Sequence, residues 1–254
     1  MAGYVEKGII RLHEKVGPDV WRMQIELPLT AKDAKPGQFI HVKVGDSSKL
    51  LRRPISIAGA EAGKGLVEII YRIVGEGTEL LSRMKVGDRL DSLGPLGTHF
   101  SMNAGHIVGV GGGVGIAPIL FMARRAEAKQ MTIVIGGRNK EEVFWKDFFP
   151  KNVKQLIVTT DDGSYGIKGF SVSVLPELFA KEKVDECCIC GPEIMMRKAA
   201  EMAADAGIYC EVSMERRMGC GTGTCLACVC DKANGGHYKV CLDGPVFDAK
   251  EVVL

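Results

Sequence analysis

The sequence lacks any apolar run long enough to span a lipid bilayer, so it predicts no membrane-spanning helix. The stretch from Met1 to Lys7 lacks the apolar core of a signal peptide. A strong excess of either charge is also missing, because the formal net charge is only +2. Nothing in this balance points to nucleic acid or to an anionic membrane as a partner. We therefore expect a cytoplasmic globular protein.

Cysteine is missing from the first two thirds of the chain, and all nine cysteines lie in the last third. A disulfide framework usually occurs in a smaller, secreted chain. With 254 residues, this chain is long enough for one large domain or for two to three small ones. The crowding of thiols therefore favours a metal site in a reducing compartment.

The densest group of cysteines has the spacing C-x4-C-x2-C, at Cys220, Cys225 and Cys228, with Cys241 following. This is the plant-type spacing for a 2Fe–2S cluster. Glycines between the cysteines allow tight turns that bring backbone N–H groups to the sulfurs. A zinc site is the main alternative, although zinc sites favour two C-x(2–4)-C pairs. Plain packing is the other alternative, and Cys230 is an extra thiol that we do not predict to be a ligand.

Alternating apolar residues in the first hundred positions predict short strands separated by turns. Such spacing favours an antiparallel barrel or sandwich. One helical stretch, Glu76–Met84, interrupts the strands. The predicted strands are Tyr4–Leu12, Val20–Leu27, Phe39–Val44, Ile55–Ala58 and Leu66–Ile73.

Two segments of this region carry groups that suit phosphate. Arg52 and Arg53 begin a strand, and a planar guanidinium matches a diphosphate. A second strand ends just before Gly77 and Thr78, where a helix begins, and helix N-termini favour anions. Either segment alone could equally be a solvated surface feature. Together they predict a flavin site formed by Arg53, Pro54, Ile55, Ser56, Ile70, Tyr71, Arg72, Gly77 and Thr78.

The middle of the chain alternates strands with helices, which predicts a parallel sheet covered on both faces. A strand leads into a glycine-rich turn with Gly111, Gly112, Gly113 and Gly115, followed by a predicted helix Ile116–Lys129. Glycines at this point allow the backbone to approach a phosphate closely. The turn therefore predicts a nucleotide site at the carboxyl ends of the strands.

Two further residues near these strand ends have open roles. Cys190 ends a predicted strand, and its chemistry alone favours a small buried hydrophobe over a reactive thiol. Arg138 could favour a 2′-phosphate, but one arginine does not decide between NADP and NAD. We expect a multidomain protein with an antiparallel β-barrel flavin domain (1–101), an α/β parallel-sheet nucleotide-binding domain (102–212) and a small C-terminal 2Fe–2S module (213–254). The resemblance described next implies that the first two domains bind FAD and NAD.

The order of R-x-x-S, then G-x-G-T, then Gly94-Pro95-Leu96-Gly97 resembles the flavin domain of the ferredoxin–NADP reductase superfamily. The segment G-G-G-x-G-x-A-P resembles the nucleotide loop of the same superfamily. A C-G-P sequence follows, and the resemblance places its Cys190 near the nicotinamide. The usual aromatic residue of the first motif is Ile55 here, so an aliphatic contact must replace ring stacking.

The segment E-R-R-M-G-C-G-x-G-x-C-L-A-C-V-C, followed by C-x-D-G-P-V-F, closely resembles the electron-transfer subunits of class 1B dihydroorotate dehydrogenases. The resemblance covers the whole chain. It implies a catalytic partner subunit with FMN, two of each chain, and electron flow from the partner through a 2Fe–2S cluster and FAD to NAD+ in pyrimidine biosynthesis. It also implies the cluster ligands Cys220, Cys225, Cys228 and Cys241.

Two other functions stay open at this point. A flavin and iron–sulfur NAD(P)H reductase subunit serving ferredoxin or a hydrogenase would share the first two domains, although an aspartate in place of Cys220 would have favoured it. A zinc-stabilised nucleotide-binding regulator is the non-enzymatic alternative. If a partner docks near the cysteines, Met214, Met218 and Leu226 are candidates for the contact surface.

Overall fold

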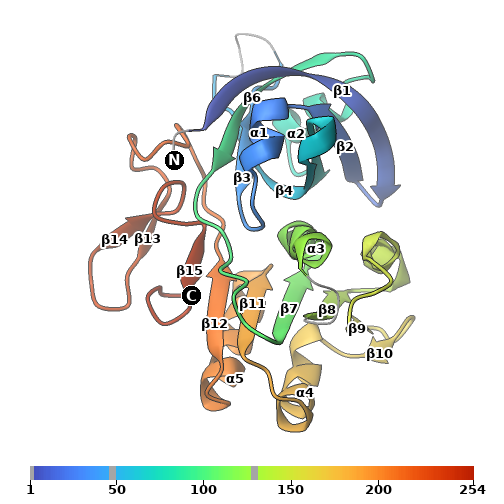
Figure 1. Ribbon diagram of the computed structural model, residues 1–254, viewed down its shortest axis with the longest axis vertical. Helices are drawn as coiled ribbons and strands as arrows, with labels where there is room; N and C mark the ends of the chain where they lie inside the picture. Colours follow the sequence, from blue (N-terminus) through green and yellow to red (C-terminus); the bar gives the residue numbers. More distant parts are fainter. Residues whose placement is uncertain (1–2, 46–49, 127–130) are drawn as a thin grey trace.

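The first part of the chain forms a closed antiparallel barrel in a computed structural model that describes residues 3–45, 50–126 and 131–254 (Figure 1). Buried apolar residues alternate along its strands and fill its interior, with Ile10, Met23, Ile40 and Ile69 among them. The predicted barrel is confirmed. Its order is β1 (Tyr4–Gly17), β2 (Val20–Glu26), β5 (Leu66–Arg72), β4 (Arg53–Glu61), β3 (Phe39–Val42) and β6 (Arg89–Leu96), with α1 (Pro28–Asp33), η1 (Ala62–Lys64) and α2 (Glu76–Ser82) in the connections.

The middle part forms a seven-stranded sheet below the barrel (Figure 1), and the predicted parallel α/β arrangement is confirmed. Six strands are parallel, while the seventh, β15, runs antiparallel at one edge. The order across the sheet is β10 (Ile167–Lys168), β9 (Gln155–Thr160), β8 (Met131–Gly137), β7 (Ile107–Gly112), β11 (Glu186–Cys190), β12 (Tyr209–Ser213) and β15 (Val246–Asp248).

Helices cover both faces of this sheet. The glycine turn after β7 forms a short 3-10 segment and continues directly into α3, so the predicted strand–turn–helix is present. The helix expected to reach Lys129 ends at Arg125, and residues 127–130 lie outside the described part. The expected helix Glu141–Phe148 is a 3-10 segment with a break at Val143. The elements are η2 (Gly113–Gly115), α3 (Ile116–Arg125), η4 (Lys140–Phe148), η5 (Ser171–Val174), α4 (Leu175–Lys181) and α5 (Glu193–Asp205).

The barrel and the sheet share a core through α3, which lies between them in Figure 1. Apolar residues of α3 pack with Val20, Ala58 and Ile70 of the barrel in one cluster. Arg124 on the same helix donates to the buried Glu68 carboxylate of the barrel over 2.7 Å. An ion pair that is largely shielded from water requires defined geometry, so this contact fixes how the barrel sits on the sheet.

The C-terminal tail is bound to both neighbours. Its strand β15 pairs with β12, a contact that the sequence did not predict. Thr98, just after the barrel, donates its backbone N–H to the Gly244 carbonyl over 2.6 Å. Cys228 and Cys241 share a core cluster with residues of the sheet. The tail also holds a small hairpin of β13 (Val229–Asp231) and β14 (His237–Lys239).

Candidate functional site

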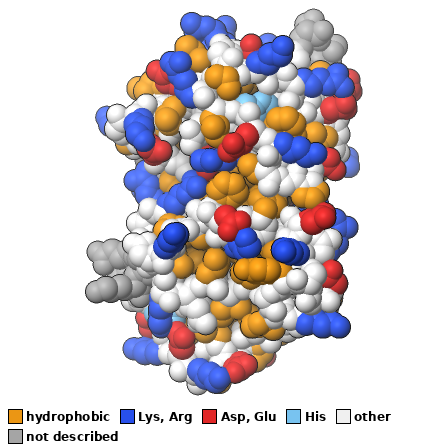
Figure 2. Space-filling model, turned by 90° about the vertical axis from the view of Figure 1, so that its right-hand side faces the viewer, with side chains coloured by type: hydrophobic (Ala, Val, Ile, Leu, Met, Phe, Trp, Pro, Cys, Tyr) orange, Lys and Arg blue, Asp and Glu red, His pale blue; other side chains and the backbone are white. Residues whose placement is uncertain are grey.

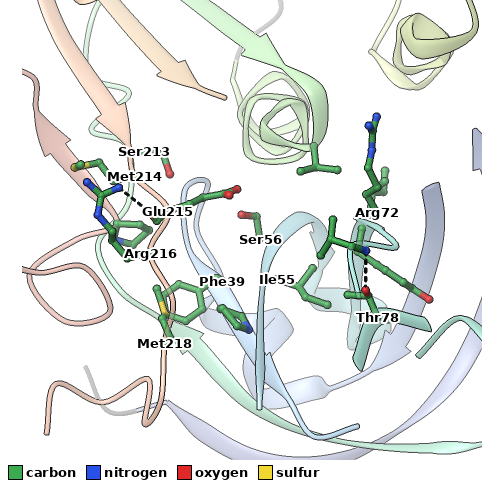
Figure 3. A pocket seen from close by; sticks show the side chains of 16 residues that line it. Phe39, Ile55, Ser56, Arg72, Thr78, Ser213, Met214, Glu215, Arg216 and Met218 are labelled. Carbon is green, nitrogen blue, oxygen red and sulfur yellow. Dashed lines mark hydrogen bonds between the residues drawn. The ribbon is translucent and has the colours of Figure 1, made fainter. Parts of the chain in front are cut away.

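A cleft of about 220 Å³ lies where the barrel, the sheet and the tail meet (Figure 3). Figure 2 shows hydrophobic side chains gathered across the middle of one face of the molecule, between the barrel above and the sheet below. The residues around the cleft come from distant parts of the sequence. They are Phe39, Pro54, Ile55, Ser56, Ile70, Tyr71, Arg72, Val74, Thr78, Val114, Ser213, Met214, Glu215, Arg216, Met218 and Pro245.

The barrel wall of the cleft comes from three strands and one helix, with Phe39 on β3. Ile55 and Ser56 lie on β4, Tyr71 and Arg72 end β5, and Thr78 lies on α2. The sequence-predicted flavin residues that line the cleft are Pro54, Ile55, Ser56, Ile70, Tyr71, Arg72 and Thr78.

The remaining two predicted flavin residues, Arg53 and Gly77, contact each other beside the cleft. A Cβ atom at Gly77 would lie 2.3 Å from Arg53 Nε, so only glycine leaves room for the guanidinium. Thr78 accepts the backbone N–H of Val74 through Oγ1 over 2.9 Å, which closes the turn before α2 (Figure 3). Arginine, hydroxyl and backbone groups therefore meet at one corner of the cleft, a combination that suits a diphosphate.

The Tyr71 phenol pairs with His13, whose Nε2 lies 2.9 Å from the phenol oxygen. Burial raises the pKa of Tyr71 above its usual range, so the phenol stays neutral. The Arg72 Nε is buried without a partner among the described residues. Because buried donors normally have partners, this unpaired donor indicates a missing acceptor in the cleft.

The opposite wall comes from the end of β12 and the segment that follows it, which the sequence did not predict to line the cleft. Ser213, Glu215 and Met218 lie on it, and Arg216 Nη1 donates to the Glu215 carbonyl over 2.9 Å. Figure 3 shows the Glu215 and Ser56 side chains pointing toward one another across the cleft. Desolvation by the cleft walls raises the pKa of Glu215.

A second cavity, of about 420 Å³, opens at the carboxyl ends of the parallel strands. Gly112 and Gly113 line it, and Arg72 lines both cavities. Gly113 has φ +58°, a conformation that L side chains rarely adopt. The nucleotide site predicted from the glycine turn thus opens beside the first cleft.

The other two glycines of the turn serve packing. A Cβ at Gly115 would lie 2.6 Å from the Cys190 carbonyl, and one at Gly111 would lie 2.9 Å from the Ile116 side chain. These contacts let α3 approach the sheet closely. Cys190 is buried at the end of β11, and burial raises the pKa of its thiol far above the usual range. It is therefore a neutral thiol and lines neither cavity.

The second cavity contains one arginine whose charge is already balanced. The Arg138 Nε donates to the Glu142 carboxylate over 2.8 Å, and the Arg138 backbone N–H donates to the same carboxylate over 3.0 Å. The Arg138 guanidinium holds the pKa of Glu142 below its usual range. A paired guanidinium has less capacity to bind a 2′-phosphate than a free one.

The cysteine loop surrounds four sulfurs with backbone N–H groups. The positive φ values of Gly221 and Gly223 turn the chain so that these groups point inward. Burial works against ionisation of Cys220, but the N–H groups of Thr222 and Cys225 outweigh it and lower the pKa of that thiol to about 5. The N–H to Sγ contacts are Thr222, Thr224 and Cys225 to Cys220 (3.3, 3.3 and 3.4 Å), Cys220 to Cys225 (3.4 Å), Gly223 to Cys241 (3.2 Å) and Cys241 to Cys228 (3.4 Å).

This donor set fits an iron–sulfur cluster, because thiolates that accept N–H groups carry negative charge that a cluster neutralises. The same four cysteines were predicted from spacing. Cys230 is buried, and its sulfur accepts none of these N–H groups. Of the predicted contact residues, only Leu226 is freely exposed, at 62%. Met214 was wrong as a surface candidate, because it is 2% exposed and packs in the cleft wall, where Met218 is half-buried.

Comparison with known proteins first defines a class. A family model described as "Oxidoreductase FAD-binding domain" matches residues 7–100. The structure of a Neisseria gonorrhoeae ferredoxin NADP+ reductase with bound FAD and NADP has the same fold, with a TM-score of 0.66 and 19% identity over 84% of this chain and 94% of that one. The barrel region thus matches an oxidoreductase FAD-binding domain, and the barrel and sheet together have the fold of that reductase.

The tail narrows this class to one family. A model described as "Iron-sulfur cluster binding domain of dihydroorotate dehydrogenase B" matches residues 215–253. The chain is 38% identical to the dihydroorotate dehydrogenase B (NAD(+)) electron transfer subunit of Desulforamulus reducens, over 94% of each protein, and 39% identical to that of Bacillus pumilus, over 95% of each. The chain therefore belongs to the family of dihydroorotate dehydrogenase B electron transfer subunits.

A solved structure also resembles nearly the whole chain. Its title concerns flavin-based electron bifurcation and the NADH-dependent reduced ferredoxin-NADP oxidoreductase. The TM-score is 0.87 and the identity 34%, over 97% of this chain and 89% of that chain. Across the described ranges, no helix is both long and apolar enough to cross a membrane.

Proposed function

We propose that this chain carries electrons from a dihydroorotate-oxidising partner subunit, through a 2Fe–2S cluster and FAD, to NAD+. One observation carries the proposal. The segment Ser213–Met218 leaves the nucleotide-binding sheet, forms a wall of the flavin cleft and runs directly into the cysteine loop at Cys220. The three sites are therefore adjacent, as stepwise electron transfer requires.

Different residues of the cleft bind the diphosphate and the ring of FAD in this proposal. Arg53, Arg72 and Thr78 supply charge and a hydroxyl at the diphosphate corner, where Arg72 Nε has no partner within the described part of the chain. Ile55 and Tyr71 supply apolar and aromatic surface for the flavin ring, with Ile55 in the place of an aromatic residue. When bound, FAD exchanges electrons singly with a cluster and in pairs with a nicotinamide.

The nucleotide side of the protein positions NAD+. Gly112 and Gly113 let the backbone approach the phosphates, and Arg138, paired with Glu142, also lines the cavity. Ser56 and Glu215 face one another across the first cleft (Figure 3), and Arg72 lines both this cleft and the second cavity. Cys190 is buried near Glu215 and Ser213, and it stays a neutral thiol.

The four loop cysteines hold the cluster, and the surface around them meets the partner. Cys225 is exposed, and Leu226, Val229 and Leu242 expose apolar side chains near it. Such a patch suits a docked protein. The partner of this proposal is an FMN-containing catalytic subunit, and the assembly has two of each chain. We place it in the cytoplasm, since cluster-ligating cysteines beside others that form no disulfide suit a reducing compartment.

The test uses the complex purified anaerobically from its native cell by a tag on this chain. Dihydroorotate and NAD+ are added, and NADH absorbance is followed. Formation of NADH, with iron, sulfide, FAD and FMN in the sample, supports the proposal. A sample that reduces dyes with NADH yet forms no NADH from dihydroorotate contradicts the partner and substrate.

A second candidate, a reductase subunit serving ferredoxin, draws on the structural relative with a TM-score of 0.87. The cysteine at position 220, where an aspartate would favour such a subunit, argues against it. The same sample distinguishes the two, because this alternative predicts reduction of ferredoxin by NADH or NADPH and no response to dihydroorotate.

A further inference from the structure

His41 lies on β3 between the barrel core and the cysteine loop. Its side chain is completely buried, with 0% exposure. A Cβ atom at Gly221 would lie 2.5 Å from His41 Nδ1 and 3.0 Å from Cε1. The ring therefore packs directly on the loop backbone next to Cys220, and only glycine permits that approach.

Neither ring nitrogen of His41 makes a hydrogen bond of normal geometry with a described residue, and the hydrogen-bonding group beside the ring is the backbone of Cys220 in the loop. The neighbouring Arg52 donates to the His41 backbone carbonyl over 3.3 Å and to the Asp91 carboxylate over 2.8 Å, not to the ring. A neutral imidazole always has one N–H to donate, and a buried donor without an acceptor is unfavourable. His106 shows the usual situation, because its Nδ1 lies 2.9 Å from the Lys183 carbonyl and its Nε2 lies 3.0 Å from Thr132 Oγ1.

Strand β3 also connects this histidine to the flavin cleft. Phe39 lies two residues earlier on the same face of the strand, and its ring lines the cleft. The Phe39 and His41 rings meet edge to face with centroids 6.3 Å apart. One face of a single strand thus contacts the cleft at one end and the cysteine loop at the other.

We propose that His41 is a positioning residue for the cluster: its ring N–H donates to a sulfur of the loaded cysteine loop and thereby raises the reduction potential of the cluster. The inference rests on the proposed function, since it requires a cluster in the loop. It adds a donor on the barrel side of the loop to the backbone donors that the loop itself supplies.

The expected direction follows from charge. Reduction adds an electron to the cluster, and a hydrogen bond to its sulfurs stabilises the more negative state. Removing the donor should therefore lower the midpoint potential. Second-shell donors of this kind tune metal sites without being ligands.

The test compares the complete chain with His41→Leu, which removes the donor, and with His41→Gln, which keeps an N–H. His106→Leu is the matched control, because it also removes a buried histidine ring but lies away from the loop. Iron, sulfide and FAD contents are measured first. The cluster midpoint is then measured by EPR-monitored redox titration, with the FAD midpoint followed in the same sample.

We expect His41→Leu to lower the equilibrium constant for reducing the cluster about tenfold, which is about 59 mV for a one-electron couple. The FAD midpoint should stay unchanged, and His41→Gln should lie closer to the wild type. A His41→Leu midpoint equal to that of the wild type overturns the proposal. If His41→Leu fails to load a cluster, His41→Gln decides, and a full tenfold drop in that variant also overturns it. A wild-type chain without iron and sulfide contradicts the proposed function instead.

Discussion

The cysteine loop and the flavin cleft are adjacent sites that the chain forms in opposite ways. The loop draws its four sulfurs from one short segment, Cys220–Cys241, and surrounds them with its own N–H groups. The cleft draws its walls from the barrel, the sheet and the tail. A local site depends on each ligand, whereas an assembled site depends on how the parts pack together.

The loss of one ligand should have the largest effect. Cys225→Ser should prevent cluster assembly and abolish electron transfer to or from the partner, while FAD reduction by NADH continues. Cys230→Ser is the control and should keep the cluster, because Cys230 accepts no loop N–H group. Iron and sulfide analysis, together with anaerobic assays, measures both. Coupling of dihydroorotate to NAD+ in Cys225→Ser would contradict the electron path.

A variant in the tail, with the second largest expected effect, tests whether the tail unfolds together with the sheet. Phe247 on β15 is buried, and the centroid of its ring lies 5.1 Å from that of the Tyr238 ring. Phe247→Ala should lower the free energy of unfolding by about 3–5 kcal/mol, because it leaves a cavity in the shared core. Chemical denaturation of the cluster-loaded chain measures this, with the exposed Val253→Ala as control. Cluster loss with an unchanged transition of the sheet would show that the two parts are independent.

A smaller effect concerns a buried carboxyl pair where the barrel joins the sheet. Ser101 donates its backbone N–H to Glu211 over 2.9 Å and its hydroxyl to Glu186 over 2.7 Å. Burial, with Glu186 adding to it, raises the pKa of Glu211 to about 7. The folded protein thus keeps a proton that the unfolded chain releases from about pH 4.5 upward.

The stability from Glu211 is therefore full below about pH 4.5 and is lost as the pH rises to about 7. The loss amounts to at most about 3 kcal/mol. Glu211→Gln should flatten this slope, since an amide does not titrate. Urea denaturation at a series of pH values measures it. Equal slopes in the two proteins would show that the pair does not hold this proton.

The smallest effect is expected in the cleft. Arg53→Ala should weaken FAD binding by about 1.5–3 kcal/mol, the contribution of a hydrogen bond to a charged group. Other parts of the cleft should retain the rest of the affinity. Arg11→Ala, which removes an exposed arginine paired with Glu26, is the control. Fluorescence titration of the FAD-free chain measures both. Complete loss of FAD from Arg53→Ala would contradict this, because it would mean that the cleft depends on a single residue as strongly as the loop depends on each cysteine.

Much of the architecture could be predicted from the sequence. The barrel followed from alternating strands, and the parallel sheet followed from alternating strands and helices. Two errors have a local cause, since α3 ends at Arg125 and the segment after β8 is a broken 3-10 helix. The pattern of apolar residues does not distinguish an α-helix from such a segment. The assigned roles of individual site residues remain predictions.

The sequence by itself determined the features that depend on short-range geometry: the cysteine spacing, the glycine turn and the strand periods. Only the tertiary structure decided the pairing of β15 with β12, the cleft wall with Glu215, and the packing of His41 under Gly221. The physical reason is the separation of the contacting residues along the sequence. Short-range patterns are fixed by φ/ψ preferences and side-chain spacing, whereas contacts between distant segments depend on how all the cores pack at once.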